Sequence, residues 1–186
     1  QEIHERIGLV METLFEDRLA EFYETLAYHF VKGRSVIKAV DYLVKSGEKS
    51  LARYAVEEAY VYFKEAYELL EPKADKSEAE KVALVDLLNS WAYAYYYLGE
   101  FKEFVSLFNA WNALAESLGD GPRLGMFDAW FGIALWMSPS SNPSKSQKGL
   151  ERNGFLEQAV WIWGSCTKRK RDSIRPVKAF RGQSPF

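Results

Sequence analysis

The chain has 186 residues, a net charge of −2, 48% hydrophobic residues, 16% aromatic residues and one cysteine. This composition excludes a disordered chain, and the length suits one domain or one short array of repeats. The single cysteine, Cys166, excludes an internal disulfide and a multi-cysteine metal site. No apolar run approaches the roughly 18 residues that cross a bilayer, so we expect a cytoplasmic protein without a membrane partner.

The spacing of apolar residues predicts helices before residue 138, and no alternating strand pattern appears there, so we expect an all-α fold. The first helix is indicated by Ile3, Ile7, Val10 and Leu14, which recur at steps of four, three and four. In chain order, the predicted helices cover residues 2–15, 18–33, 36–53, 56–70, 77–98, 101–118 and 122–137.

Polar caps and helix breakers define the predicted helix ends. Asp17, Ser35 and Ser77 are suitable N-cap residues, because their side-chain oxygens can accept hydrogen bonds from free N–H groups. Pro72 stops the 56–70 helix, and Gly99 supplies the backbone freedom that a helix end needs. The helices are therefore expected to follow one another through short turns.

The two helices on either side of Gly99 are rich in aromatic residues at helical spacing. Their apolar stripes are Leu88, Trp91, Ala92 and Tyr95 before the glycine and Phe101, Phe104, Phe108 and Trp111 after it. A single hairpin cannot bury so much apolar surface by itself. The pattern therefore predicts neighbouring hairpins of the same kind, as in stacked helical repeats.

The sequence resembles the tetratricopeptide repeat. Ala59, Phe63 and Ala66, followed by Pro72, are similar to the second helix of that repeat, and the stripe from 88 to 95 is similar to its first helix. The resemblance implies stacked antiparallel helix hairpins in a right-handed superhelix, an α-solenoid, over residues 1–137.

Residues 2–72 are also similar to the segment that follows the NTPase module in bacterial signalling proteins, including adenylate/guanylate cyclase-like proteins and signal-transduction ATPases. In that group the repeats act as sensor or partner-binding arrays. The resemblance implies that the chain, which begins with Gln1, is part of a larger signalling protein. It implies a non-catalytic module that binds a protein or peptide partner.

A second face of the 77–98 helix carries the candidate binding residues. These are Asp86, Asn89, Tyr93 and Tyr96, which are offset from the core stripe. In the family geometry this face lines the concave surface, where Tyr supplies contact area with a polar tip. Asp128 and Phe131 are the corresponding candidates on the 122–137 helix, and Glu48 is a weaker one. Alternatively, Tyr93 and Tyr96 pack against an adjacent helix.

No motif indicates catalysis or a cofactor. The sequence has no phosphate-binding loop and no dinucleotide fingerprint, and His4 and His29 lack the local context of a metal site. We therefore expect no catalytic residue, no metal and no cofactor. The alternatives to partner binding are a self-associating scaffold, with the chain as a homo-oligomer, and a small-ligand sensor or helical enzyme.

The C-terminal part differs in composition from the rest. From residue 143 to the end there are ten Lys/Arg and three Asp/Glu, a charge of +7, whereas 14 Lys/Arg and 23 Asp/Glu before it give −9. We expect a Ser/Pro/Lys-rich linker over 138–154, then a short helix and a basic irregular tail over 155–186. One hypothesis is that this tail is not the natural continuation of the repeats. The basic run at 168–171 is short, so nucleic-acid binding is not expected, although an acidic partner stays an alternative.

Overall fold

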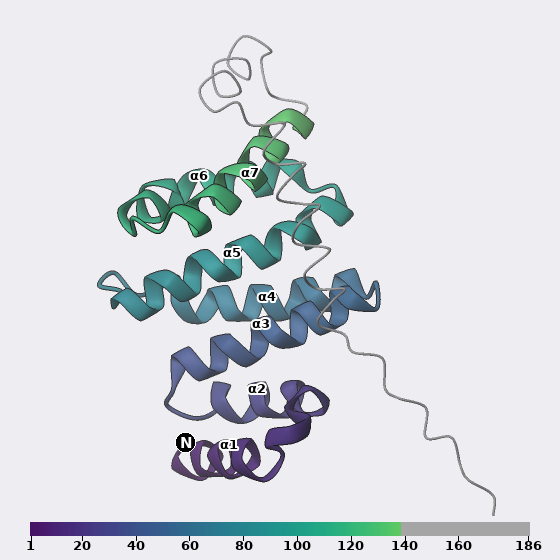
Figure 1. The fold of residues 1–186 in the computed structure, drawn as a ribbon, viewed down its shortest axis with the longest axis vertical. Helices are drawn as coiled ribbons and strands as arrows, with labels where there is room; N and C mark the ends of the chain where they lie inside the picture. Colours follow the sequence, from purple (N-terminus) through teal and green to yellow (C-terminus); the bar gives the residue numbers. More distant parts are fainter. Residues whose placement is uncertain (139–186) are drawn as a thin grey trace, which may run out of the picture. The chain divides into compact units, whose positions relative to one another are not determined.

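The computed structural model describes residues 1–138, and all regular elements within them are helices (Figure 1). They are α1 (Glu2–Leu14), η1 (Glu16–Glu21), α2 (Tyr23–Val31), α3 (Val36–Ala52), α4 (Val56–Leu70), α5 (Glu78–Leu98), α6 (Phe101–Ser117) and α7 (Gly121–Met137). The all-α prediction is confirmed for this part of the chain. No helix in it has the length and apolar character to cross a membrane. The predicted basic tail, and all of the predicted linker after residue 138, lie outside the described residues.

Helices that follow one another in the chain pack together, since each of the helices α1 to α6 contacts the next numbered α-helix. In addition, α3 packs against α5, and α5 packs against α7. Helix α5 is therefore bordered by α3, α4, α6 and α7, which makes it the central element of the described residues.

The ends of α5 follow the predicted cap chemistry. The Ser77 N–H donates to Glu80 Oε2 at 2.9 Å, and the Glu80 N–H donates to Ser77 Oγ at 3.3 Å, which is a complete capping box. The ammonium of Lys73 also pairs with the Glu80 carboxylate, and this pairing together with the Ser77 N–H lowers the pKa of Glu80 to about 2. At the other end Gly99 adopts φ 76°, and its N–H donates to the Tyr95 carbonyl at 3.0 Å.

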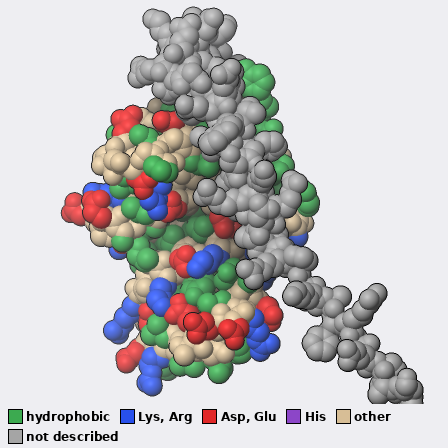
Figure 2. Space-filling view, in the orientation of Figure 1, with side chains coloured by type: hydrophobic (Ala, Val, Ile, Leu, Met, Phe, Trp, Pro, Cys, Tyr) green, Lys and Arg blue, Asp and Glu red, His purple; other side chains and the backbone are tan. Residues whose placement is uncertain are grey.

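Helix α1 forms as predicted, but the rest of residues 1–138 leaves its apolar stripe exposed. Instead the opposite side of the helix contacts α2: a Cβ placed on Gly8 would lie 2.7 Å from Phe30 Cζ, so glycine permits this close approach. Glu12 also reaches α3, where it accepts a hydrogen bond from Tyr42 Oη at 2.8 Å. In Figure 2 hydrophobic side chains lie among charged ones at the lower end, where Figure 1 places α1 and α2.

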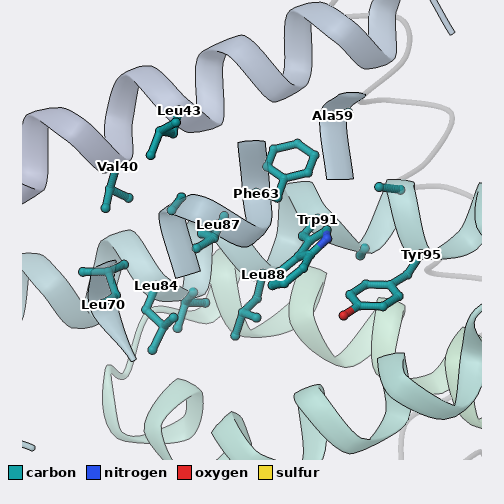
Figure 3. Packing of buried hydrophobic residues seen from close by; sticks show 14 of the residues in the cluster. Val40, Leu43, Ala59, Phe63, Leu70, Leu84, Leu87, Leu88, Trp91 and Tyr95 are labelled. Carbon is teal, nitrogen blue, oxygen red and sulfur yellow. The ribbon is translucent and has the colours of Figure 1, made fainter. Parts of the chain in front are cut away.

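The buried core runs through the successive helix contacts. Figure 3 shows the part of it between α3, α4 and α5, where Phe63 and Trp91 lie near each other. A Cβ on Gly47 of α3 would lie 2.5 Å from Phe63 Cε1, so this glycine allows α3 and α4 to pack closely. The largest fully buried side chains are Phe30, Phe63, Phe104, Phe108, Phe127, Leu26, Leu43, Leu70, Leu84, Leu87, Leu88 and Val40.

The predicted 18–33 helix is wrong, because the structure has two elements there. Asp17 lies inside η1 rather than at a helix start, and Arg18 has the non-helical angles φ −142° and ψ 32°. The chain folds here so that Phe15 and Phe22 stack with their ring centroids 4.2 Å apart, and the Arg18 guanidinium lies over both rings. Aromatic stacking and a cation–π contact thus replace the continuous helix.

Ser35 lies at the N-cap of α3, but its side chain makes no cap hydrogen bond. The carboxylate of Glu5 instead binds the turn that leads into α3, since its Oε2 accepts from the N–H groups of Arg34 at 2.8 Å and Ser35 at 3.2 Å. A side chain of α1 thus fixes the backbone just before α3.

Candidate functional site

Within residues 1–138, one narrow face of α5 is only partly covered by its neighbours α3 and α7. It is formed by Asp86, Ser90, Tyr93 and Tyr97, which recur at steps of four, three and four and which we call the α5 strip. Asp86 and Tyr97 are exposed, and Ser90 and Tyr93 are half-buried. The strip is therefore the part of α5 that a partner could contact.

Side chains from both neighbouring helices border the α5 strip. From α3, Glu48 accepts a hydrogen bond from Ser90 Oγ at 2.9 Å. From α7, Arg123 binds Asp86 with two nitrogens, at 2.7 Å from Nε to Oδ1 and at 3.2 Å to Oδ2. A bidentate arginine–carboxylate pair fixes orientation as well as distance. The strip is thus part of a surface that continues from α3 across α5 to α7.

Arg123 is held by a second carboxylate as well. Asp120 is the N-cap of α7, and its Oδ1 accepts from the Arg123 N–H at 3.1 Å while Oδ2 pairs with the guanidinium. The backbone hydrogen bond and the guanidinium lower the pKa of Asp120, and the pairing with Asp86 raises the pKa of Arg123. The cluster therefore holds one cation between two carboxylates.

Tyr93 and Tyr96 both contact Trp130 of α7. The rings of Tyr93 and Trp130 meet edge to face with centroids 4.5 Å apart, and those of Tyr96 and Trp130 are 6.2 Å apart. Tyr96 also lies near Phe101 at the start of α6, and 44% of its surface is exposed. The two tyrosines thus pack on an adjacent helix, as in the alternative considered from the sequence, and Tyr96 lies beside the α5 strip rather than on it.

Asn89 faces α7 and not the open strip. Its Nδ2 donates to the Arg123 carbonyl at 3.4 Å, and its Oδ1 is buried without a hydrogen-bond partner. The indole nitrogen of Trp130 is likewise buried without a partner. Asn89 therefore belongs to the contact between α5 and α7.

Phe131 contacts α6, and neither Phe131 nor Asp128 has a contact with the α5 strip among those found in the described residues. Phe131 stacks near Phe108 of α6, with ring centroids 6.3 Å apart. Burial and the nearby charge of Glu116 raise the pKa of Asp128. On α7 it is Arg123 and Trp130 that face α5.

Sequence reasoning missed Ser90, Tyr97, Arg123 and Trp130. A signal for the first two exists, because 86, 90, 93 and 97 form a regular helical row. Arg123 and Trp130 could not be assigned in this way, since their role depends on how α7 packs against α5. Glu48, the weaker candidate, does lie at the border of the strip.

The described residues offer little for metal or acid–base chemistry. No group of three or more His, Cys, Asp or Glu side chains among residues 1–138 could hold a metal ion. The two histidines meet between α1 and α2, with His4 Nδ1 lying 3.0 Å from His29 Nδ1. Burial, and then the charge of His4, lower the pKa of His29. The α5 strip itself presents two phenol rings, a hydroxyl and one carboxylate.

The chain matches no protein-family model, and neither a characterised protein nor a solved structure matches it.

Proposed function

We propose that residues 1–137 form a tetratricopeptide-like right-handed stack of helix hairpins, which acts as a non-catalytic interaction or sensory module. Two kinds of contact support the stack: each helix packs on the next, and α3, α5 and α7 pack one after another. In helical repeat proteins such alternating helices form one continuous binding surface. The sequence resemblance supports the further proposal that the module adjusts a linked NTPase or cyclase in a larger cytoplasmic signalling protein.

The α5 strip is the proposed binding surface for a peptide or an extended segment of a partner. The observation that carries this proposal is the exposed ring of Tyr97, 58% accessible, on the same row as Tyr93 and Asp86. An exposed tyrosine offers a large rigid contact area and a hydroxyl that can bind the partner's backbone.

The charges around the strip favour a basic partner segment. Asp86 lies on the strip, Glu48 borders it from α3, and Asp120 lies beside it at the start of α7. Arg123, the cation that borders the strip, is paired with both Asp86 and Asp120. Carboxylates therefore outnumber cations here, and we expect the bound segment to carry Lys or Arg beside an apolar residue.

The test is a selection of random displayed peptides on the full chain, followed by fluorescence anisotropy with the enriched sequences. Tyr97→Ala should weaken binding at least tenfold, because it removes the exposed ring and leaves the buried core intact. The matched control is Tyr28→Ala on α2, since Tyr28 is 54% exposed and lies away from the strip. Equal affinities of the two variants for every enriched peptide would reject the strip as the binding surface.

Charge is tested separately. Asp86→Asn should weaken a Lys- or Arg-containing peptide several-fold, and added salt should reduce the difference because it screens exposed charges. Glu68→Gln on α4 removes another exposed carboxylate and should leave the affinity unchanged. If both substitutions act alike, the attraction is due to net charge and not to the strip.

A further inference from the structure

Helix α1 carries a row of apolar side chains that nothing covers among the described residues. Ile3, Ile7, Val10 and Leu14 are 73%, 38%, 62% and 70% exposed. The opposite side of the helix makes the contacts that hold it, through Gly8 against Phe30 of α2 and the other contacts described above. We call the four exposed side chains the α1 stripe.

The apolar row on the central helix α5 is buried, whereas the α1 stripe is exposed. Leu88, Trp91 and Tyr95 of α5 have a similar spacing, but they are buried against α4 and α6. A helix face that is apolar along its length is normally covered by another helix. The α1 stripe therefore has the character of an interface whose partner helix lies outside residues 1–138 of a single copy.

The spacing of the α1 stripe makes it complementary to itself. Steps of four, three and four are the same when read in either direction, and they match the seam of a coiled coil. Two antiparallel copies related by a two-fold axis between Ile7 and Val10 would place Ile3 opposite Leu14 of the second copy. Ile7 would lie opposite Val10 of the second copy, so every apolar side chain meets another.

The charges beside the α1 stripe are compatible with this pairing. Arg6 flanks the stripe, is exposed and has no ion-pair partner in the described residues. In the antiparallel arrangement its nearest flanking neighbour is Thr13 of the second copy, an uncharged residue. No two like charges are therefore brought directly opposite each other along the seam.

We propose that a second copy of this chain covers the α1 stripe through an antiparallel α1–α1 contact. Closed two-fold symmetry uses the same patch on both copies, which suits a self-complementary row. Four apolar side chains are far fewer than the about 20–30 residues a side of a standard interface. The dimer is accordingly weak and dissociates on dilution.

The experiment is analytical ultracentrifugation of the full chain over a wide concentration range. The weight-average mass should rise from the monomer value of 21.4 kDa toward twice that value as the concentration increases. Val10→Glu should abolish the rise, because it places a charge in the middle of the seam. A constant monomer mass up to the highest concentration would overturn the proposal and would leave another protein's helix as the occupant.

The control is Val61→Glu on α4, which matches Val10 in residue type and exposure, at 61% against 62%. It should leave the self-association unchanged; equal loss in both variants would overturn the proposal. Circular dichroism shows whether Val10→Glu is folded, and Leu14→Ser provides a milder second variant that should weaken the dimer at least tenfold.

The antiparallel direction has its own test. In a Cys166→Ser background, a mixture of Ile7→Cys and Val10→Cys chains should form the mixed disulfide faster than either chain pairs with itself. Faster self-pairing of each variant would show a parallel or unrelated contact and would overturn the arrangement. Peptide binding at the α5 strip is measured independently, so this proposal and the proposed function can fail separately.

Discussion

Helices α5 and α1 carry similar apolar rows and have opposite surroundings. In α5 the row includes Leu88 and Trp91, which are buried because α3, α4, α6 and α7 border the helix. In α1 the row includes Val10 and Leu14, which are exposed because α2 packs on the other side. The difference teaches that helical spacing identifies an apolar face, whereas the neighbouring helices decide whether that face is buried.

The largest difference in the free energy of unfolding should appear between two single variants, each with one leucine of a row replaced by alanine. Leu88→Ala removes a fully buried side chain and should lower the free energy of unfolding by about 2–5 kcal/mol. Leu14→Ala removes a side chain that is 70% exposed and should change it by less than about 0.5 kcal/mol. Urea unfolding of dilute protein measures both values. Similar losses would show that the α1 stripe is covered within one copy.

A smaller difference in the free energy of unfolding is expected between variants at the N-caps of α5 and α3. Ser77→Ala removes the capping box of α5 and should cost about 1 kcal/mol of unfolding free energy. Ser35→Ala should cost only a few tenths, because the Ser35 hydroxyl makes no cap hydrogen bond, and the Ser35 N–H that binds Glu5 is kept in alanine. The measurement is thermal or urea unfolding of the two variants. The opposite order would contradict the cap assignment of α3.

Acid should affect the two regions in different pH ranges. The pKa of His29 is lowered from 6.5, so its neutral form stabilises the α1–α2 contact fully above pH 6.5, and this stability is lost as pH falls through the lowered pKa. The pKa of Glu80 is lowered from 4.5 to about 2, so the α5 cap is fully effective above pH 4.5 and is lost only as pH falls toward 2.

Amide NMR signals of α1 and α5 during a pH titration would separate these two transitions. We expect α1 signals to shift first, and His29→Gln to remove that early transition while the α5 transition stays in place. An unchanged α1 transition in His29→Gln would mean that another group controls the contact.

Most of the helices could be predicted from the sequence, because their signals are local. Ser77, Pro72 and Gly99 act on backbone groups within one turn, and the structure places helix ends beside each of them. The predicted 18–33 helix is wrong because of a contact between side chains that lie on either side of η1. The stacking of Phe15 on Phe22 competes with helical hydrogen bonding, and helical spacing alone gives no sign of this.

The candidate site was predictable only in part. Asp86 and Tyr93 lie on the α5 strip, whereas Asn89 faces α7 and Tyr96 lies at the edge between α6 and α7. The 3.6-residue period predicts which residues share a face of a helix, but it does not predict which other helix lies against that face. For the same reason Phe131, chosen by analogy of position, contacts Phe108 of α6 instead.

By itself, the sequence determined most of the helices, the caps at both ends of α5 and the rows of residues that share a face, because these depend on contacts within a few residues. Only the tertiary structure decided which rows are buried. It placed Arg123 against Asp86, brought His4 to His29 and left the α1 stripe uncovered. These outcomes depend on packing between helices far apart in the chain, where a rotation of one residue, about 100°, turns a side chain from one neighbour to another.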